Sequence, residues 1–284
     1  MIEAATNARL RAEVAALRAR AKRIAFVPTM GNLHAGHRRL VEAAQRRADA
    51  VIVSIYVNPL QFGPREDFAA YPRTPTDDRA LLTHAGVDLL YAPGEREIYP
   101  RGRELQTQVE VPHLGDILCG AFRAGHFRGV ATVVARLLGL VAPDVAFFGK
   151  KDYQQLLVIR RMVADLALPV EIADVDIVRE PDGLALSSRN AYLSAEERRM
   201  APALYATLKQ TRTRVQEGTP PADAEDTAMT ALRAAGFRPD YVSVRRRHDL
   251  GEPQPDDSAL VVLAAAWLGR TRLIDNLEFE RTAF

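Results

Sequence analysis

Two histidines near the start of the chain have the spacing and surroundings of a phosphate-binding loop. His34 and His37 lie on either side of Gly36, in a ten-residue string that directly follows the apolar run Ile24–Pro28. That run is typical of a buried strand, and backbone N–H groups at the start of a following helix form an anion site. Two imidazoles there can donate hydrogen bonds to oxygens on which charge develops in a transition state. The HxGH spacing alone fits two structural histidines equally well, and its place after a strand favours the phosphate site.

An amide-containing segment follows the next β-like run. Asn58–Gly63 comes directly after Val51–Val57, at what would be the carboxyl end of a second strand. The Gln61 amide can donate and accept at once, which suits a ligand that carries hydroxyls and a carboxylate. Alone, Gln61 would more often be a residue that structures its loop.

A pair of lysines marks a third segment. Only four of the 38 basic residues are lysines, and two of them, Lys150 and Lys151, follow Gly149. A codon bias of the genome explains the scarcity. Glycine permits close backbone approach, and lysine is a compact point charge for phosphate. Asp152 can cap the helix that follows or accept ribose hydroxyls, and Gln155 lies one turn after Lys151.

A fourth segment, Asp182–Asn190, combines two hydroxyls with a guanidinium on a turn. Ser187, Ser188 and Arg189 would make a phosphate clamp, although for this string taken alone a hydroxyl-rich capping turn is the favoured interpretation. The chain contains neither a Walker A loop nor a GxGxxG fingerprint.

Composition excludes several classes of protein. With 284 residues and 48% hydrophobic residues, the chain is long and apolar enough for a substantial core. A net charge of +2 argues against nucleic acid as a partner, and the single cysteine excludes an intramolecular disulfide framework. The sequence shows neither a secretory signal nor an apolar stretch long enough to span a bilayer, so we expect no membrane partner and a cytoplasmic location.

Strand and helix patterns alternate over the first part of the chain. Strands are expected at 24–28, 51–57, 87–93, 145–149 and 170–175. Helices are expected around Leu10–Leu17, near 38–47, from Asp77 onward, and near 130–140 and 153–166. This βαβ alternation predicts an α/β fold with a parallel sheet. Thr76 is a plausible N-cap for the helix that begins at Asp77.

The pattern changes near residue 180. A capping box, Ser194-x-x-Glu197, opens a long helix to about Gln216, and a second helix runs to about Ala235. Three β-like runs follow without alternating helices, which predicts a smaller α+β domain. We therefore expect domains at 1–178 and 179–284.

Taken together, the strings PTMGNLHAGH, VSIYVNPLQFG, FGKKDYQQL and DGLALSSRNAYLS closely resemble the pantothenate synthetase (pantoate–β-alanine ligase) family. The HxGH string alone would indicate only the wider nucleotidyltransferase superfamily. The resemblance implies a Rossmann-like ATP- and pantoate-binding domain with a C-terminal α+β lid domain, usually in a homodimer. It also implies that pantoate is first adenylated by ATP, and that the amine of β-alanine then displaces AMP.

The resemblance carries over site residues position by position. His37, His34, Lys151 and Arg189 match catalytic positions, and His37 matches the one described as a proton donor, although stabilisation of charge fits equally well. Gln61 and Gln155 match positions that hold pantoate. ATP-binding positions, besides the four catalytic ones, are matched by Met30, Gly31, Gly149, Lys150, Asp152, Val178, Leu186, Ser187 and Ser188. Asp77 and Asp78 match an acidic pair linked to the Mg²⁺ that accompanies ATP, while Lys150 matches no phosphate-binding role of its own.

Departures from the family pattern are small. Asn32 and Ala35 stand where the family has Ala and Glu, and Leu186 stands where Met is common. None of these is a phosphate donor. Three alternative functions remain open at this point. One is an adenylyltransferase that releases an adenylylated product, and the others are an RNA-binding relative of the tRNA synthetases and an inactive nucleotide-binding module.

Overall fold

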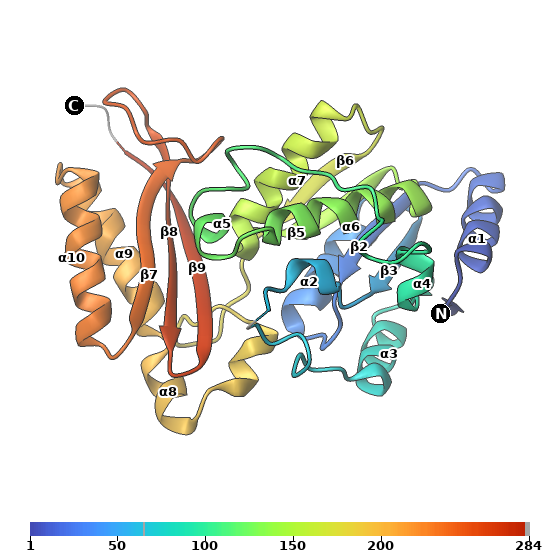
Figure 1. Ribbon diagram of the computed structural model, residues 1–284, viewed down its shortest axis with the longest axis horizontal. Coiled ribbons are helices and arrows are strands. Elements are labelled where there is room, and N and C mark those ends of the chain that lie inside the picture. The colour runs from blue at the N-terminus through green and yellow to red at the C-terminus, as the bar shows by residue number, and fades with distance from the viewer. Residues whose placement is uncertain (65, 282–284) are drawn as a thin grey trace. The chain divides into compact units, whose positions relative to one another are not determined.

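The chain forms two compact units. The computed structural model describes residues 1–64 and 66–281 (Figure 1). The first unit comprises Met1–Lys150 and Gln155–Asp176, and the second comprises Lys151–Gln154 and Ile177–Phe284. Lys151–Gln154, which the sequence analysis groups with the first domain, thus belong to the second unit.

A parallel sheet of six strands forms the centre of the first unit, in the order β1-β4-β3-β2-β5-β6. Its strands are β1 (Ile2–Ala4), β2 (Ile24–Thr29), β3 (Ala50–Ile55), β4 (Leu89–Tyr91), β5 (Val145–Gly149) and β6 (Glu171–Val175). The strand order reverses at β2, which lies between β3 and β5, and ligands of open α/β sheets bind beyond the carboxyl ends of strands at such a reversal. The expected α/β class with a Rossmann-like sheet is confirmed.

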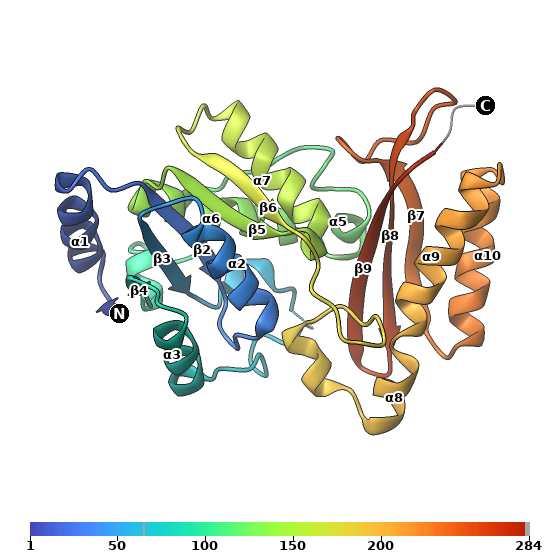
Figure 2. The ribbon, with the colours of Figure 1, turned by 180° about the vertical axis from the view of Figure 1, so that it is seen from behind.

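Helices cover both faces of this sheet. They are α1 (Asn7–Ala19), α2 (Ala35–Gln45), α3 (Pro75–His84), α4 (Glu95–Ile98), α5 (Cys119–Phe122), α6 (His126–Val141) and α7 (Tyr153–Asp165), with 3₁₀ turns η1 (Pro59–Gln61) and η2 (Lys150–Asp152). Helices α2 and α3 share one apolar cluster with the strands, through Leu40, Val41 and Leu82. Helix α6 lies across the opposite face (Figures 1 and 2).

Two sequence-based expectations for the helices were wrong at helix ends. Helix α3 begins at Pro75 with Thr74 as N-cap, so Thr76 lies inside the helix. Proline suits the first position because the N–H that it lacks would have no intrahelical partner there. The expected long helix to Gln216 is divided at Pro202, since a proline inside a helix removes a backbone hydrogen bond. Its two parts are α8 (Ala195–Met200) and α9 (Ala203–Gln216).

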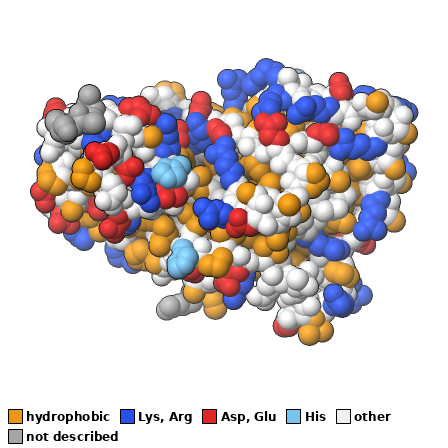
Figure 3. Space-filling model, turned by 90° about the horizontal axis from the view of Figure 1, so that it is seen from above, with side chains coloured by type: hydrophobic (Ala, Val, Ile, Leu, Met, Phe, Trp, Pro, Cys, Tyr) orange, Lys and Arg blue, Asp and Glu red, His pale blue; other side chains and the backbone are white. Residues whose placement is uncertain are grey.

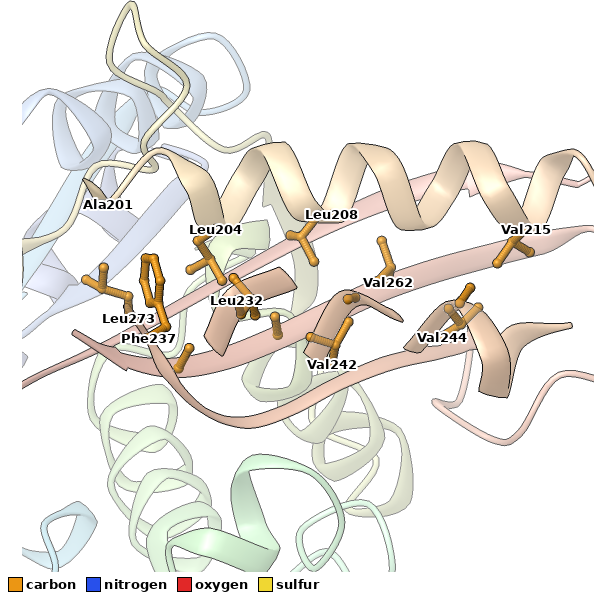
Figure 4. Packing of buried hydrophobic residues seen from close by; sticks show 14 of the residues in the cluster. Ala201, Leu204, Leu208, Val215, Leu232, Phe237, Val242, Val244, Val262 and Leu273 are labelled. Carbon is orange, nitrogen blue, oxygen red and sulfur yellow. The ribbon is translucent and has the colours of Figure 1, made fainter. Parts of the chain in front are cut away.

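The second unit contains an antiparallel sheet of three strands, β7 (Arg238–Arg246), β8 (Ala259–Leu268) and β9 (Thr271–Glu280). Helix α9 and helix α10 (Pro221–Ala234) pack together on one face of it. Figure 4 shows the apolar side chains between these helices and the sheet, among them Leu204, Leu208, Leu232, Val242 and Val262. Alternation along the strands supplies this core, so the expected smaller α+β region is confirmed.

The surface mixes charges of both signs. On the face drawn in Figure 3, Lys and Arg side chains alternate with Asp and Glu side chains, in keeping with the net charge of +2. Within residues 1–64 and 66–281, no helix combines the length and apolarity that crossing a membrane requires.

Candidate active site

The loop between β2 and α2 is fixed by a buried carboxylate. Asp78, which is 3% exposed, accepts hydrogen bonds from the backbone N–H groups of Asn32 at 3.0 Å and Leu33 at 2.8 Å. Gly31 has a φ of +82°, and a Cβ there would lie 3.0 Å from an Asp78 carboxylate oxygen. Only glycine meets both demands without strain. Asn32 also has a positive φ, of 50°, which asparagine tolerates better than most other residues.

The two histidines cap helix α2 reciprocally. His34 is the N-cap residue, and its Nδ1 accepts from the N–H of Gly36 at 3.1 Å. The Nδ1 of His37 accepts from the N–H of His34 at 3.2 Å, so each ring satisfies a backbone donor that the helix start leaves without an intrahelical partner. A Cβ on Gly36 would lie 2.8 Å from Cε1 of His34, which explains the glycine between the histidines.

This capping arrangement selects one tautomer of each ring. A nitrogen that accepts a hydrogen bond carries no proton, so in the neutral rings the proton lies on Nε2. Each histidine therefore presents an Nε2–H donor, and the ring centroids lie only 4.2 Å apart. Two such donors at a helix N-terminus, where the backbone dipole adds positive potential, are suited to bind phosphate oxygens.

Gln61 is held by a buried network at the end of β3. Its Nε2 donates to Sδ of Met30 at 3.0 Å, and its Oε1 accepts from Nδ2 of Asn58 at 3.0 Å. Asn58 is 1% exposed and accepts from the Tyr99 hydroxyl at 2.6 Å. A Cβ on Gly129 would lie 2.2 Å from the carbonyl oxygen of Leu60, so this glycine allows α6 to approach η1. The first two predicted segments therefore meet at Met30 and Gln61.

Three residues that the sequence analysis missed fix the backbone of Gln61. His126 Nδ1 lies 2.8 Å from the Gln61 carbonyl oxygen, and an Nη of Arg123 donates to the same oxygen at 3.3 Å. Arg123 also forms two hydrogen bonds with the Glu66 carboxylate, at 2.8 and 2.5 Å. Burial by itself would raise the pKa of Glu66, but the hydrogen bonds and charge of Arg123 outweigh it and leave the pKa below its usual value. The partners of Arg123 and His126 lie 57 to 65 residues away in the sequence, so no local pattern could predict these contacts. The Arg-x-x-His string at the start of an apolar helix was the only signal for them in the sequence.

The acidic pair on α3 consists of one buried and one exposed carboxylate. Both oxygens of Asp78 accept hydrogen bonds from the protein, including one from the Thr74 hydroxyl at 3.1 Å. Asp77 is exposed, and successive residues on a helix do not face each other. Within residues 1–64 and 66–281, no group of three or more His, Cys, Asp or Glu side chains could hold a metal ion. Asp78 thus fixes the backbone of the histidine loop, and the place of the pair beside Mg²⁺ stays a prediction.

The end of β5 carries Gly149 and Lys150. A Cβ on Gly149 would meet no atom within 4 Å, so the backbone there is open to close approach. The Lys150 ammonium lies 2.9 Å from a carboxylate oxygen of Asp176 and 3.4 Å from one of Asp174. Lys150 is thus paired with two carboxylates of its own unit, and its predicted place at the ATP site stays a prediction. Gln155 lies in the first turn of α7 and is partly buried.

The second unit brings Val178 and Leu186 together. The chain turns back on itself here, with Gly183 at a φ of +97° in the turn. The N–H of Leu186 donates to the Val178 carbonyl at 2.9 Å, and Arg179 pairs with Ala185 as an antiparallel bridge. The two residues that the resemblance places beside adenine are therefore backbone neighbours.

The serine-rich string continues directly from this turn. Ser187 caps η3 (Ser188–Tyr192), and its hydroxyl oxygen accepts from the N–H of Arg189 at 3.2 Å. Asn190 donates from Nδ2 to the Ala185 carbonyl at 3.0 Å and so ties the turn to the string. Ser187, Ser188 and Arg189 are all partly buried. The Ser187 oxygen thus accepts a capping hydrogen bond, as a capping turn predicts. The O–H group of the same residue can still donate a hydrogen bond.

Lys151 and Asp152 also belong to the second unit. The Lys151 side chain is 20% exposed, and its ammonium lies 4.0 Å from a carboxylate oxygen of Asp152. The Lys151 carbonyl accepts from Nδ2 of Asn276 on β9 at 3.0 Å. The predicted residues therefore fall into two sets. The histidine loop, Gln61, Gly149, Lys150 and Gln155 are in the first unit, and Lys151, Asp152, Val178 and Leu186–Arg189 are in the second.

Comparison with known proteins identifies the family. The family model described as "Pantoate-beta-alanine ligase" matches residues 3–278 of the chain. The chain belongs to the pantoate–β-alanine ligase family. Members of this family are ligases that join pantoate to β-alanine, and the chain is such a ligase.

Similarity to individual proteins extends over the whole chain. Pantothenate synthetase of Shewanella sp. (strain MR-7) is 54% identical over 99% of this chain and 100% of its own length. That of Thioalkalivibrio sulfidiphilus is 57% identical over 96% of each chain. The crystal structure of the Thermus thermophilus enzyme superimposes with a TM-score of 0.91 at 50% identity, covering 98% of this chain and 99% of the other. A Francisella tularensis pantoate–β-alanine ligase, described as complexed with "Beta-gamma ATP and Beta-alanine", has a TM-score of 0.84 at 32% identity, covering 98% and 97%.

Proposed function

We propose that the chain makes pantothenate in two steps that share a pantoyl-adenylate intermediate. In the first step, a carboxylate oxygen of pantoate attacks the α-phosphorus of ATP, and the bond to the β-phosphate oxygen breaks to release pyrophosphate. In the second, the amine of β-alanine attacks the acyl carbon, loses a proton, and displaces AMP. Adenylation is needed because a free carboxylate is a poor acyl donor.

The first step joins two anions, so the enzyme must supply positive charge and hydrogen-bond donors at the phosphates. We assign this task to His34, His37, Lys151 and Arg189, with Ser187 and Ser188 as further donors. These groups stabilise charge on the phosphate oxygens more strongly in the transition state than in bound ATP, which is the condition for acceleration.

The single observation that carries this assignment is the reciprocal cap. Because both Nδ1 atoms accept backbone N–H groups, at 3.1 and 3.2 Å, both neutral rings carry their proton on Nε2. Protonation of Nδ1 would break a cap. His37 therefore acts as a hydrogen-bond donor that stabilises charge, rather than as an acid that gives up its proton.

The other predicted residues take substrate-positioning roles. Gln61 and Gln155 bind pantoate, since primary amides serve its hydroxyls and carboxylate together. Val178 and Leu186 flank adenine, while Gly149 and Asp152 serve the ribose and Met30 and Gly31 line the ATP site. The Francisella tularensis relative is described as complexed with "Beta-gamma ATP and Beta-alanine", which supports ATP and β-alanine as substrates of this chain.

Mg²⁺ enters the proposal with ATP. Magnesium retains several waters and is held mainly by substrate phosphates, with few protein ligands. Asp77 and Asp78 are the residues that would lie beside it, and the hydrogen bonds that Asp78 accepts from the loop would orient its carboxylate. When bound, the ion would neutralise phosphate charge.

We also propose a homodimer, on the resemblance to the family, and a cytoplasmic location, where ATP is supplied. Light scattering at micromolar concentration tests the first, and an average mass equal to one chain would contradict it. Microscopy of a fluorescent fusion tests the second, and signal outside the cytoplasm would contradict it.

The two-step route is tested with purified enzyme by following pyrophosphate and AMP separately. We expect ATP–pyrophosphate exchange that needs pantoate but not β-alanine, and AMP release that needs both. If AMP release or sustained ATP consumption were indifferent to β-alanine, the chain would be an adenylyltransferase of another kind. If exchange required β-alanine, no free-standing adenylate would form.

A further inference from the structure

The segment that carries Lys151 is attached to a strand far away in the sequence. Asn276, on β9, donates from Nδ2 to the Lys151 carbonyl at 3.0 Å, across 125 positions of the chain. Two residues further on, the Tyr153 hydroxyl contacts Oε1 of Glu278 at 2.8 Å and the Arg247 carbonyl at 2.9 Å. These contacts explain why Lys151–Gln154 belong to the second unit.

Asn276 is itself rigidly held. It is 3% exposed, and its neighbour Asp275 is 4% exposed, so two polar residues in succession are buried on one strand. Asp275 accepts two hydrogen bonds from Arg179, at 2.6 and 2.9 Å, and Arg179 also donates to the Asn276 carbonyl at 3.2 Å. The Arg179 guanidinium in turn stacks 3.5 Å from the ring centroid of Tyr205.

Such a buried polar arrangement is costly unless every member is satisfied. An apolar residue at position 276 would fill the same volume without that cost. The side-chain amide of Asn276 donates to the carbonyl of the one lysine assigned to phosphate chemistry. A backbone fixed at this point limits where the lysine side chain can reach, and displacements of about 1 Å reduce rates by about 100-fold in positioned catalysis.

We propose that Asn276 is a positioning residue for Lys151, held in register by the Arg179–Asp275 pair. This inference rests on the proposed role of Lys151 in adenylation. Asn276 acts through the Lys151 backbone, and its amide makes no contact with the substrate in this assignment. Tyr153 and Glu278 secure the other end of the same segment.

A double-mutant cycle on the full-length enzyme tests the inference. Lys151→Ala, Asn276→Leu and the double variant are compared by pantoate-dependent ATP–pyrophosphate exchange, with the KM for ATP and kcat determined separately. We expect Asn276→Leu to lower kcat about tenfold, the size of one lost buried hydrogen bond. In the Lys151→Ala background the same change should have almost no further effect, because sites that act as a unit are not additive.

A second variant keeps the inference testable if Asn276→Leu fails to fold. Asn276→Asp retains the shape of the side chain but replaces the donor with an acceptor, and only its protonated form can donate to the Lys151 carbonyl. Its activity relative to wild type should therefore rise as the pH falls from about 8 to about 6, because burial raises the pKa of a carboxyl group. A flat ratio would contradict the inference.

Thr211→Val is the matched control. Thr211 is a 1% exposed residue of α9 whose hydroxyl donates to the Thr207 carbonyl of the same helix at 2.9 Å. Its loss should lower the melting temperature and leave kcat unchanged in both backgrounds. If the losses of kcat caused by Asn276→Leu and Lys151→Ala multiplied in the double variant, Asn276 would have only a structural role. If Lys151→Ala itself exchanged pyrophosphate normally, the proposed role of Lys151 would fail instead.

Discussion

The histidine loop and the Lys151 segment achieve the same kind of positioning by opposite means. In the loop, each histidine ring caps a backbone N–H two or three residues away. The Lys151 segment is held by Asn276, 125 residues away. Local contacts leave a recognisable string because spacing alone determines them, whereas the partners of Lys151 lie in a part of the chain with no motif. A motif is therefore easiest to recognise where all the contacts that build its geometry lie within a few residues of one another.

The largest effect is expected when a hydrogen-bond donor of the histidine loop is removed. We expect His34→Ala to reduce pantoate-dependent ATP–pyrophosphate exchange at least about 100-fold, as loss of one preorganised donor does in other enzymes. The measurement is kcat/KM for ATP. His84→Ala, at an exposed position in the last turn of α3, is the control and should leave exchange unchanged. Near-normal exchange in His34→Ala would remove the histidine from the chemistry.

A smaller effect is expected when the glycine between the two histidines is replaced, which tests whether their spacing determines the geometry of the loop. In Gly36→Ala the added methyl would lie 2.8 Å from His34 Cε1, so we expect the ring to turn and kcat to fall about tenfold. Alanine favours helix by up to about 1 kcal/mol over glycine, so stability should not fall in parallel.

Gly139→Ala is the matched control for this change. It lies on exposed α6 surface, where a Cβ meets no atom within 4 Å, and it should leave kcat unchanged while raising the melting temperature. Equal kcat values for the two variants would show that the His34 ring tolerates the methyl group.

The smallest effect concerns the long-range clamp on Gln61. Glu66→Gln removes the charge that Arg123 binds, and we expect the KM for pantoate to rise about threefold with kcat little changed. Because the pKa of Glu66 is lowered in the folded protein, its ion pair stabilises the fold fully above the usual glutamate pKa. That contribution is lost as the pH falls through the folded pKa.

Thermal melts in acid therefore provide a second measurement. The wild type should lose more of its melting temperature between about pH 5 and about pH 3 than Glu66→Gln does. Glu3→Gln, which breaks an exposed pair with Arg79, should change neither the KM for pantoate nor the acid dependence of melting by a comparable amount. Identical acid profiles for wild type and Glu66→Gln would contradict the clamp.

The secondary-structure elements and the family could be predicted from local patterns of residues. Apolar runs such as Ile24–Pro28 and the alternation of strand and helix patterns are short-range properties, so the α/β sheet and the smaller α+β unit followed from them. The helix boundaries were predicted less well from the sequence. Pro75 and Pro202 shift them, because proline as well as the capping residue determines where a helix begins or ends. The HxGH string was readable because its contacts span only a few residues.

The residues that fix the predicted site residues in place became visible only in the folded chain. The Asp78 carboxylate, which was predicted to lie beside Mg²⁺, also accepts hydrogen bonds from the backbone of the histidine loop. Arg123 and His126 reach Gln61, and Asn276 reaches Lys151, across long stretches of chain. The physical reason is that a hydrogen bond depends on where two chain segments meet in space. Residue types at one position cannot specify that meeting point, and it emerges only when the sheets and their cores are packed.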